Sequence, residues 1–542
     1  MKTVLSGRLF FVSLLGIAFV CLLGAFSQIL EPDAAQYAEI SWEISLSHNW
    51  LQIFSMQKDY LDKPPLLFWI TAFCFKLLGV GNFTYRLPSL AFAALAVFST
   101  LRFARLFYEE NVARMAALIL ASTQAFFMLT YDVRTDTLLM GTVIFSLWQM
   151  AVYLENRKLL NLFSACVGAG LAMLTKGPIG ILVPVFTFLP ILILKKEWNK
   201  IFDWKYVVAF LVVGLLLLPM CIGLYQQFGK EGLRFYFWTQ SFGRITGENV
   251  WKNNPDPFFL AHSTLWAFLP WSLFLIVGLF LSCKKMVFAK SETNSEVEHY
   301  SFSGFLLTAI SLMLSKYQLP HYIFVVYPLG AIMAAAAINR ATYQWINTIQ
   351  LAVVTGMWVV IAGLNFYLFF SGTWVVIVFS LCLLTTLFLF YNSKSLFLFS
   401  FASILSANVL MNVNINPQLL SYQPSQEIGT YLLQHKIPRE QFREYHAGYF
   451  FSLSFYWQKT FRSSYILEHI EEAVTENKEL YVLTDEEHFQ QIKQHTGWQI
   501  ETLSTHFMYM VSQLKWEFLN PATRKSVAKK EYFIKISARD II

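Results

Sequence analysis

The stretch that decides the fold class lies at residues 9–30 and reads LFFVSLLGIAFVCLLGAFSQIL. It follows the basic residues Lys2 and Arg8 and contains no charged side chain. A helix of about 20 apolar residues is long enough to cross the hydrocarbon core of a bilayer, whereas the core of a signal peptide is shorter. The run therefore predicts an uncleaved first membrane span whose N-terminus lies in the cytoplasm.

The composition of the whole chain also indicates a membrane protein. Of the 542 residues, 56% are hydrophobic and only 14% are Asp, Glu, Lys or Arg, whereas a soluble domain carries about 25% charged residues. This composition excludes a disordered chain, a fibrous repeat and an ordinary cytosolic enzyme. The net charge of +7 is small for this length and indicates membrane topology rather than nucleic-acid binding, so we expect no nucleic-acid partner.

Further apolar runs predict an α-helical polytopic membrane protein with about 13 transmembrane helices. After the first run they lie at about residues 88–107, 113–131, 137–153, 159–175, 178–194, 206–225, 257–281, 300–315, 320–337, 346–370, 373–391 and 395–411.

Clusters of Lys and Arg in alternate loops predict the orientation. They lie at residues 102–105, 157–158, 195–200, 284–285 and 340, and cytoplasmic loops are enriched in these residues. All of these loops face the cytoplasm only if the apolar run Leu66–Leu78 does not span the membrane. We therefore expect this run to form a helix in the outer membrane–water interface.

The composition becomes polar after residue 411. The apolar segment Leu480–Thr484 predicts a strand, and helical patterns flank it at Ile466–Asn477 and Glu486–His495. We expect a membrane domain at residues 1–411, whose first outer loop at 31–87 carries interfacial helices, and a small α/β domain at 412–542. An odd number of spans places this second domain on the non-cytoplasmic side.

Polar residues gather at the ends of the spans that this topology places outside. Each group taken alone also fits a structural role, such as a helix cap, a solvated loop residue or a local ion pair. Together they surround one outward face. The candidates are Asp33, Tyr37, Tyr60, Asp62, Lys63, Arg134, Asp136, Lys176, Arg244, Lys316 and His321.

Carboxylates, cations and aromatic residues around an outward cavity fit the transfer of a group from a lipid-linked phosphate. The cations would neutralise the departing phosphate, and a carboxylate would accept the proton of an attacking hydroxyl. A single base without a carboxylate nucleophile implies inversion at the anomeric carbon. A transporter or flippase of lipid-linked sugars is the alternative, although a transporter usually carries charges deep within its helices.

Several motifs resemble one known family in their order along the chain. They are Glu31-Pro32-Asp33-Ala-Ala-Gln-Tyr37-Ala-Glu39, Asn49-Trp50, Asp62-Lys63-Pro64-Pro65, Tyr85-Arg86-Leu-Pro88, Arg134-Thr135-Asp136, Leu174-Thr175-Lys176-Gly177-Pro178 and Leu319-Pro320-His321-Tyr322. This series resembles the membrane glycosyltransferases with the GT-C fold, in particular the lipid A aminoarabinose transferases and the bacterial protein-mannosyltransferase-like enzymes. The resemblance covers about residues 5–340.

The resemblance implies a polyprenyl-phosphate sugar donor, such as one built on undecaprenyl phosphate, that reaches the site from the outer leaflet. It implies Asp33 as the catalytic carboxylate and Lys63 and Arg244 as ligands of the donor phosphate. It also implies that further residues support the cavity: Tyr37, Tyr60, Asp62, Arg134, Asp136, Lys176, Lys316 and His321.

The sequence departs from the family pattern at two places. Asp62 stands where the family usually has Glu, and the segment before Arg244 lacks the His that is frequent in aminoarabinose transferases. The sugar is therefore expected to be an aminoarabinose-like pentose or a hexose, and the acceptor to be lipid A, with another glycolipid or a protein as alternatives.

These observations predict an inverting glycosyltransferase of the bacterial inner membrane. Its active site and C-terminal domain are expected to face the periplasm, and membrane lipids surround its spans. We expect no cofactor and no catalytic metal, because no cluster of His, Cys and Asp has the spacing of a ligand set. A protein O-mannosyltransferase-like activity is a further alternative.

Overall fold

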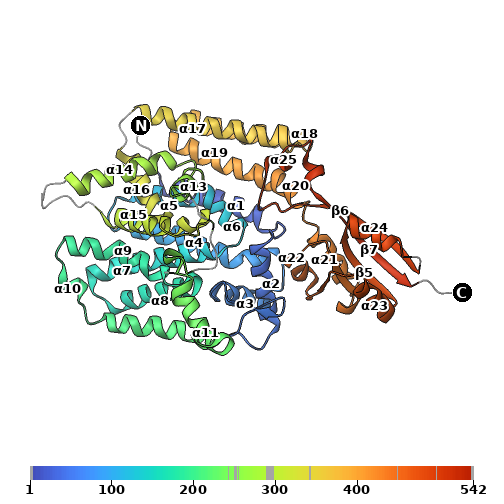
Figure 1. Cartoon of the computed structure of the whole chain (residues 1–542). Helices are drawn as coiled ribbons and strands as arrows, with labels where there is room; N and C mark the ends of the chain where they lie inside the picture. Colours follow the sequence, from blue (N-terminus) through green and yellow to red (C-terminus); the bar gives the residue numbers. More distant parts are fainter. Residues whose placement is uncertain are drawn as a thin grey trace.

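The computed structural model describes residues 4–241, 243–248, 253, 256–288, 298–340, 344–448, 450–495 and 497–538, apart from the side chains at positions 244, 245, 287 and 288. A bundle of long helices forms one part of the molecule, and a sheet with its helices forms the other part at the C-terminal end (Figure 1).

The apolar runs form the helices of the bundle. These are α1 (Gly7–Ala25), α4 (Asn82–Ala104), α5 (Glu110–Ala121), α6 (Gln124–Tyr131), α7 (Thr135–Asn156), α8 (Leu159–Lys176), α9 (Ile179–Leu194), α11 (Tyr206–Arg234), α13 (Phe259–Ala267), α14 (Ser272–Phe288), α15 (Tyr300–Met313), α16 (Tyr327–Arg340), α17 (Gln344–Gly363), α18 (Thr373–Ser393) and α19 (Leu396–Leu410). Shorter segments connect or extend them: α10 (Trp198–Ile201), η1 (Phe235–Thr239), α12 (Gly243–Thr246), η2 (Pro320–Val326), η3 (Leu364–Leu368), η4 (Met411–Ile415) and α20 (Asn416–Leu420).

The helices confirm an α-helical integral membrane protein. Among the described residues, nine helices are long and apolar enough to cross a membrane, or ten if the bent pair α5 and α6 forms one span. Each of the thirteen predicted runs forms a helix or a broken helix pair. Helices α9, α14 and α15 are shorter than a typical span. Whether each of them crosses the membrane, and with it the count of about thirteen spans, stays a prediction.

The run predicted to lie at the membrane surface forms helix α3 with the predicted bounds, Leu66–Leu78. At a rise of about 1.5 Å per residue, thirteen residues extend about 20 Å, which is shorter than the hydrocarbon core. Helix α3 packs against α2 (Asp33–Leu46) and α4. Between α2 and α3, the strands β1 (Phe54–Ser55) and β2 (Lys58–Asp59) form a small hairpin.

The C-terminal part contains a five-stranded sheet in the order β4-β3-β5-β7-β6. Strands β3 and β5 are parallel neighbours, and β7 runs antiparallel to β5 and β6. The strands are β3 (Phe442–Tyr445), β4 (Arg462–Ser464), β5 (Glu479–Asp485), β6 (Trp498–Met508) and β7 (Lys529–Ala538); the helices and turns are α21 (Ser425–Gln434), η5 (Arg439–Gln441), α22 (Phe451–Trp457), α23 (Glu468–Asn477), α24 (Glu486–Lys493), α25 (Trp516–Leu519) and α26 (Arg524–Val527).

The central strand β5 confirms the strand predicted at Leu480–Thr484, and α23 and α24 confirm the flanking helices to within two residues. Its side chains alternate between the two faces of the sheet. Tyr481 and Leu483 pack in one apolar cluster, and Leu480 and Val482 pack in another. The domain boundary at residue 411 stays a prediction, because the helical segment runs on from Leu396 to Leu420.

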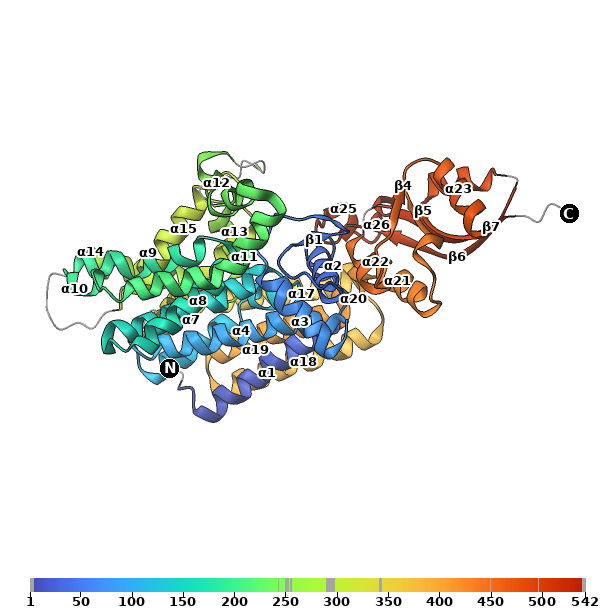
Figure 2. The same ribbon diagram turned by 90° about the horizontal axis from the view of Figure 1, so that it is seen from below.

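The short helix α10 and the end of α14, which carry predicted cytoplasmic lysines, lie at the end of the bundle that points away from the C-terminal sheet (Figure 2). The segment that carries α2 and the hairpin lies between the bundle and the sheet (Figure 2). The first outer loop therefore occupies the junction of the two parts.

Candidate active site

Asp33 is the first residue of α2 and lies beside a half-buried arginine from another loop. Arg134 Nη1 donates a hydrogen bond to Asp33 Oδ2, and Arg134 Nε donates to Asp132 Oδ2 over 2.9 Å. The side chain of Asp33 is 43% exposed, whereas that of Arg134 is 16% exposed. The carboxylate of Asp33 is thus held on one side and open to a substrate on the other.

Lys63 lies in a rigid connection between the hairpin and α3. Pro64 and Pro65 follow it, and proline restricts both its own backbone and that of the preceding residue. Lys63 Nζ lies 2.5 Å from Asp62 Oδ2, and Gln240 Nε2 donates to Asp62 Oδ1 over 2.8 Å. This arrangement fixes the position of the ammonium group of Lys63.

Lys176 is a second cation with a fixed carboxylate partner. It ends α8, and Gly177 follows with a positive φ of 81°, a backbone conformation that favours glycine. Lys176 Nζ lies 2.5 Å from Asp136 Oδ1 and 4.0 Å from the ring centroid of Tyr322. His321 Nε2 lies 3.7 Å from Asp136 Oδ2. Asp136 therefore holds Lys176 and contacts His321.

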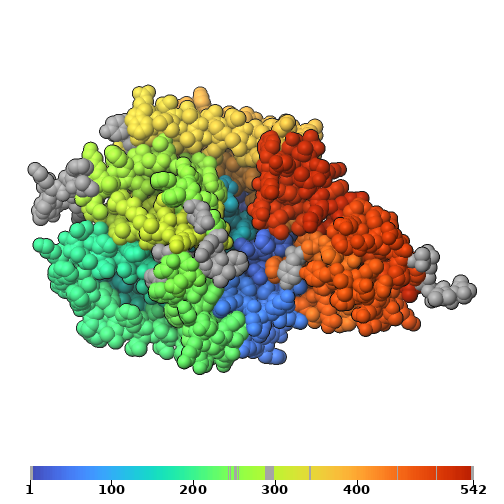
Figure 3. All heavy atoms as spheres, viewed as in Figure 1, coloured from blue at the N-terminus to red at the C-terminus, as the bar shows by residue number. Residues whose placement is uncertain are grey.

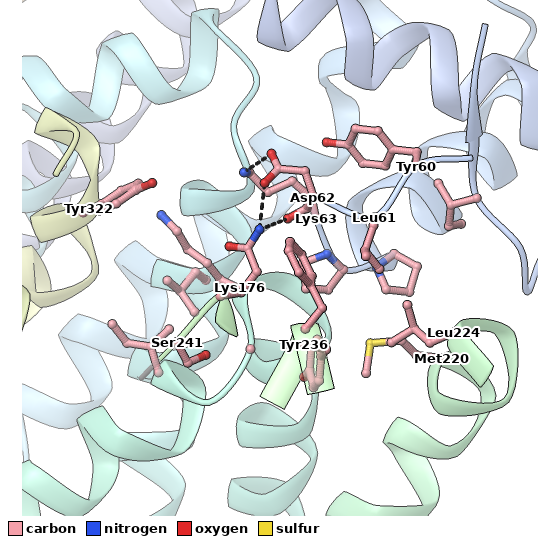
Figure 4. A pocket seen from close by; sticks show the side chains of 18 of the residues that line it. Tyr60, Leu61, Asp62, Lys63, Lys176, Met220, Leu224, Tyr236, Ser241 and Tyr322 are labelled. Carbon is pink, nitrogen blue, oxygen red and sulfur yellow. Dashed lines mark hydrogen bonds and ion pairs between the residues drawn. The ribbon is translucent and has the colours of Figure 1, made fainter. Parts of the chain in front are cut away.

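These groups surround a cavity with a polar side and an apolar side (Figure 4). Lys63, Lys176 and Tyr322 contribute to its polar side. The wall also includes Leu51, Ile53, Tyr60, Leu61, Asp62, Pro64, Pro65, Leu139, Gly177, Ile179, Leu182, Met220, Leu224, Gln227, Phe235, Tyr236, Gln240, Ser241, Ser311, Leu312 and Ser315. The cavity can thus hold an anionic group against two lysines and an apolar chain against the helices.

Two tyrosines, the buried Tyr37 and the half-buried Tyr60, connect the start of α2 to the cavity. Burial, followed by the negative charges of Asp62 and Asp33, holds the pKa of Tyr60 well above its ordinary value. Burial and the nearby charge of Asp33 also raise the pKa of Tyr37. Both phenols are therefore neutral at physiological pH and cannot serve as bases. Tyr37 lies one helical turn after Asp33, and both Tyr37 and Tyr60 pack against Phe68, with ring centroids 5.6 and 5.9 Å apart. Since Tyr60 lines the cavity, these ring contacts connect the start of α2 to the cavity wall.

The structure brings most of the predicted site residues together. Tyr60, Asp62, Lys63 and Lys176 line the cavity, while Asp33, Tyr37, Arg134, Asp136 and His321 lie around it through the contacts given above. Within the described residues, no group of three or more His, Cys, Asp or Glu side chains could hold a metal ion.

Two predicted residues are not placed in the cavity. Lys316 is exposed and lies beside Gly247, outside the residues that line the cavity. The side chain of Arg244 lies outside the described part of the chain, although its backbone belongs to α12. The role of Arg244 at the donor phosphate thus stays a prediction.

Sequence reasoning did not identify the carboxylates that hold the hairpin on α2. Glu39 accepts hydrogen bonds from Ser55 Oγ over 3.0 Å and from the backbone N–H of Met56 over 2.9 Å. Burial raises the pKa of Glu39 well above its ordinary value. A glutamate among the apolar residues of α2 was the available signal. This contact connects α2, which carries Asp33, to the hairpin that precedes Lys63.

Arg86 holds the segment that leads to Asp33. It is 1% exposed and donates hydrogen bonds to the carbonyl oxygens of Ser27 (2.6 Å), Gln28 (3.0 Å) and Tyr131 (2.8 Å). These carbonyl groups are partly buried, and part of their desolvation cost remains uncompensated when the donor is lost. Arg86 therefore has a structural function within its motif.

We expect Arg86→Leu to lower the free energy of unfolding by about 3 kcal/mol, because three partly buried carbonyl groups lose a charged donor. Thermal unfolding of the purified protein in detergent, followed by tryptophan fluorescence, measures the loss. Arg105→Leu is the control, because Arg105 pairs with Glu110 at the surface and should cost less than about 1 kcal/mol. Equal melting temperatures for the two variants would contradict the role of Arg86.

Comparison with known proteins places this geometry in context. The family model for dolichyl-phosphate-mannose-protein mannosyltransferase matches residues 62–222. The undecaprenyl phosphate-alpha-4-amino-4-deoxy-L-arabinose arabinosyl transferase 2 of Proteus mirabilis is 25% identical over 317 residues. The corresponding transferase of Pseudomonas paraeruginosa is 27% identical over 315 residues. Each match covers 57% of this chain and 56% of the relative, so the chain spans about half the length of the curated relatives it matches.

The fold of this chain is similar to that of a solved structure over nearly its whole length. The crystal structure of ArnT from Cupriavidus metallidurans bound to undecaprenyl phosphate aligns with a TM-score of 0.72 and covers 96% of this chain and 97% of ArnT, at 17% identity. The apo structure of ArnT aligns with a TM-score of 0.71. The predicted resemblance is therefore confirmed: this chain has the GT-C fold and is similar in sequence and in fold to the aminoarabinose transferases.

Proposed function

We propose that this protein is an inverting glycosyltransferase that moves a sugar from a polyprenyl phosphate, such as undecaprenyl phosphate, to an acceptor at the outer face of the bacterial inner membrane. The observation that carries the proposal is the cavity in which Lys63 and Lys176 face an apolar wall, to which the start of α2 with Asp33 is connected through the rings of Tyr37, Phe68 and Tyr60. The undecaprenyl phosphate bound to ArnT and the names of the relatives support the choice of donor.

Lys63 and Lys176 would hold the phosphate of the donor. Each ammonium group has three N–H donors and is held in place by a carboxylate, Asp62 or Asp136. At the cavity wall these ammonium groups can donate to phosphate oxygens, and the polyprenyl chain can lie against Met220, Leu224 and Leu182. The two cations would neutralise the negative charge that the phosphate gains when its bond to the sugar breaks.

Asp33 would act as the general base. As the acceptor hydroxyl oxygen forms its bond to the anomeric carbon, its proton passes to the carboxylate of Asp33. The bond between the anomeric carbon and the phosphate oxygen breaks, and polyprenyl phosphate leaves with the bonding electron pair. Attack opposite to the leaving group inverts the anomeric configuration. Arg134 would keep the carboxylate oriented during this step.

Lipid A is the proposed acceptor, and an aminoarabinose-like pentose or a hexose is the proposed sugar. The cavity and the C-terminal domain would then face the periplasm. Mass spectrometry of lipid A, other glycolipids and glycoproteins from cells with and without the gene tests this proposal. The loss of one sugar mass from lipid A in cells without the gene is expected, whereas a loss confined to a glycoprotein would favour protein O-mannosyltransferase-like activity.

The alternative of a transporter for lipid-linked sugars is tested with purified protein. We expect protein in detergent to form glycosylated lipid A when it receives the polyprenyl-phosphate sugar and lipid A, without any membrane across which to transport. Movement of the lipid-linked sugar between the leaflets of proteoliposomes, with no transfer in detergent, would contradict the proposal.

A further inference from the structure

Helix α22 of the C-terminal domain packs directly on the segment that precedes Asp33. Glu31 Oε1 accepts a hydrogen bond from the backbone N–H of Ser452 over 2.7 Å and another from Ser452 Oγ over 2.5 Å. Glu31 is 1% exposed and Ser452 is fully buried. Helix α22 lies beside α2 in two views (Figures 1 and 2), so the C-terminal domain reaches within two residues of the proposed base.

The same helix holds the chain at two further points near Asp33. The hydroxyl of Tyr456 accepts from the backbone N–H of Ile29 over 2.9 Å and donates to Asn82 Oδ1 over 2.8 Å. The ring of Phe455 packs against that of Tyr85, with centroids 6.2 Å apart.

Tyr85, which packs against Phe455 of α22, also holds the residue that follows Asp33. Its hydroxyl donates to the carbonyl oxygen of Ala34 over 2.5 Å. The backbone is thus held before Asp33, at Ile29 and Glu31, and directly after it, at Ala34. In the space-filling view, the surface of the first outer loop (blue) lies next to that of the C-terminal domain (orange and red) (Figure 3).

Burying the carboxyl group of Glu31 costs free energy, because the group loses its contact with water. Burial raises its pKa to about 7, and its Oε2 atom has no hydrogen-bond partner among the described residues. An apolar residue would fill this place without that cost. A costly polar contact next to Asp33 suits a role in orientation, because general-base catalysis depends strongly on the placement of the base.

We propose that the C-terminal domain positions the catalytic base: the contact between Glu31 and Ser452 orients the start of α2 and thereby Asp33. Glu31 and Ser452 are positioning residues, since they act through the backbone around Asp33. This inference rests on the proposed function for its kinetic test, and it also makes a structural prediction that needs no transfer.

We expect Glu31→Ala to lower kcat at least tenfold, because small displacements of a reacting group already cost this much. The donor KM should change less than twofold, since Lys63 and Lys176 do not depend on this contact. Glu31→Gln keeps an oxygen that accepts from Ser452 and should restore kcat to within about threefold of wild type. Ser452→Ala keeps the backbone N–H and should give an intermediate kcat. Rates are expressed per donor-binding site, so that misfolded protein does not count.

Glu298→Ala is a matched control. Glu298 is also a buried glutamate with a pKa raised by burial to about 7, and it accepts a hydrogen bond from the backbone N–H of Ser301 at the start of α15. It lies close to Tyr108 and outside the cavity. Its variant should lose stability without a change in kcat per site. An equal fall in kcat for both alanine variants, or none for Glu31→Ala, would overturn the positioning role.

Hydrogen exchange gives the structural readout. The backbone amides of residues 34–36 should exchange at least tenfold faster in Glu31→Ala than in wild type. In Glu298→Ala, their exchange rates should equal those of wild type. If wild-type protein transfers no sugar, the proposed function fails, and the exchange rates still decide whether the contact orders the start of α2. If wild-type protein transfers sugar but Glu31→Ala changes neither the exchange rates nor kcat, the positioning proposal is refuted and the proposed function is not.

Discussion

The Asp33→Asn variant is expected to lose about a thousandfold in kcat while it folds and inserts normally. The amide of Asn cannot accept a proton at physiological pH, and a general base contributes about 10²–10⁴ to the rate. The donor KM should stay close to that of wild type, because the proposed phosphate ligands Lys63 and Lys176 are held by Asp62 and Asp136, whereas Asp33 pairs with Arg134. Transfer from purified polyprenyl-phosphate sugar, measured at saturating donor, gives kcat.

Asp132→Asn is the matched control for this prediction. Asp132 also pairs with Arg134, over 2.9 Å, from the turn before α7. Its variant removes one carboxylate charge from the same cluster but leaves Asp33 in place. We expect a loss of less than about tenfold. If both Asn variants lost the same factor, Asp33 would contribute through the ion pair with Arg134 and would not be the base.

The second large effect is expected for Lys63→Ala, which should weaken donor binding by about a hundredfold. A charged hydrogen bond to a phosphate in a partly buried site is worth up to about 3 kcal/mol, which corresponds to this factor. Binding of undecaprenyl phosphate to the purified variant measures the loss without any transfer step. The kcat should also fall, because Lys63 would stabilise the phosphate as it leaves.

Lys58→Ala controls for a general loss of positive charge. Lys58 is an exposed residue of the hairpin strand β2 and does not line the cavity, so its variant should bind the donor as wild type does. Equal affinities for Lys63→Ala and wild type would contradict the phosphate role of Lys63. A loss of affinity in both lysine variants would indicate attraction by the overall charge rather than a contact.

Much of the fold could be predicted because hydrophobicity is a local property. The apolar runs form helices of the bundle, and Leu66–Leu78 forms one short helix with the predicted bounds. The strand at Leu480–Thr484 is marked by its apolar residues and lies at the centre of a sheet. The break between α13 and α14 was missed, since both helices lie in one apolar run.

The partners within the site could not be predicted in the same way. Arg134, Asp132 and Asp136 lie in one short turn of the sequence, so a local ion pair among them is the simplest expectation. The structure keeps the pair with Asp132, but Arg134 also reaches Asp33, which is 101 positions away. Asp136 pairs with Lys176, which is 40 positions away. Contacts between residues so far apart in the sequence depend on how the helices pack, and no local sequence pattern predicts this packing.

The sequence by itself determined the membrane class, the positions of the helices and the short set of charged residues that gather near their outer ends. These are properties of residues and their neighbours along the chain, because apolar length and the cost of burying charge act locally. Only the tertiary structure decided which carboxylate holds which cation, and that α22 lies against Glu31. Such contacts arise when distant segments pack together, so that Asp33 meets its partners through the fold and not through its motif.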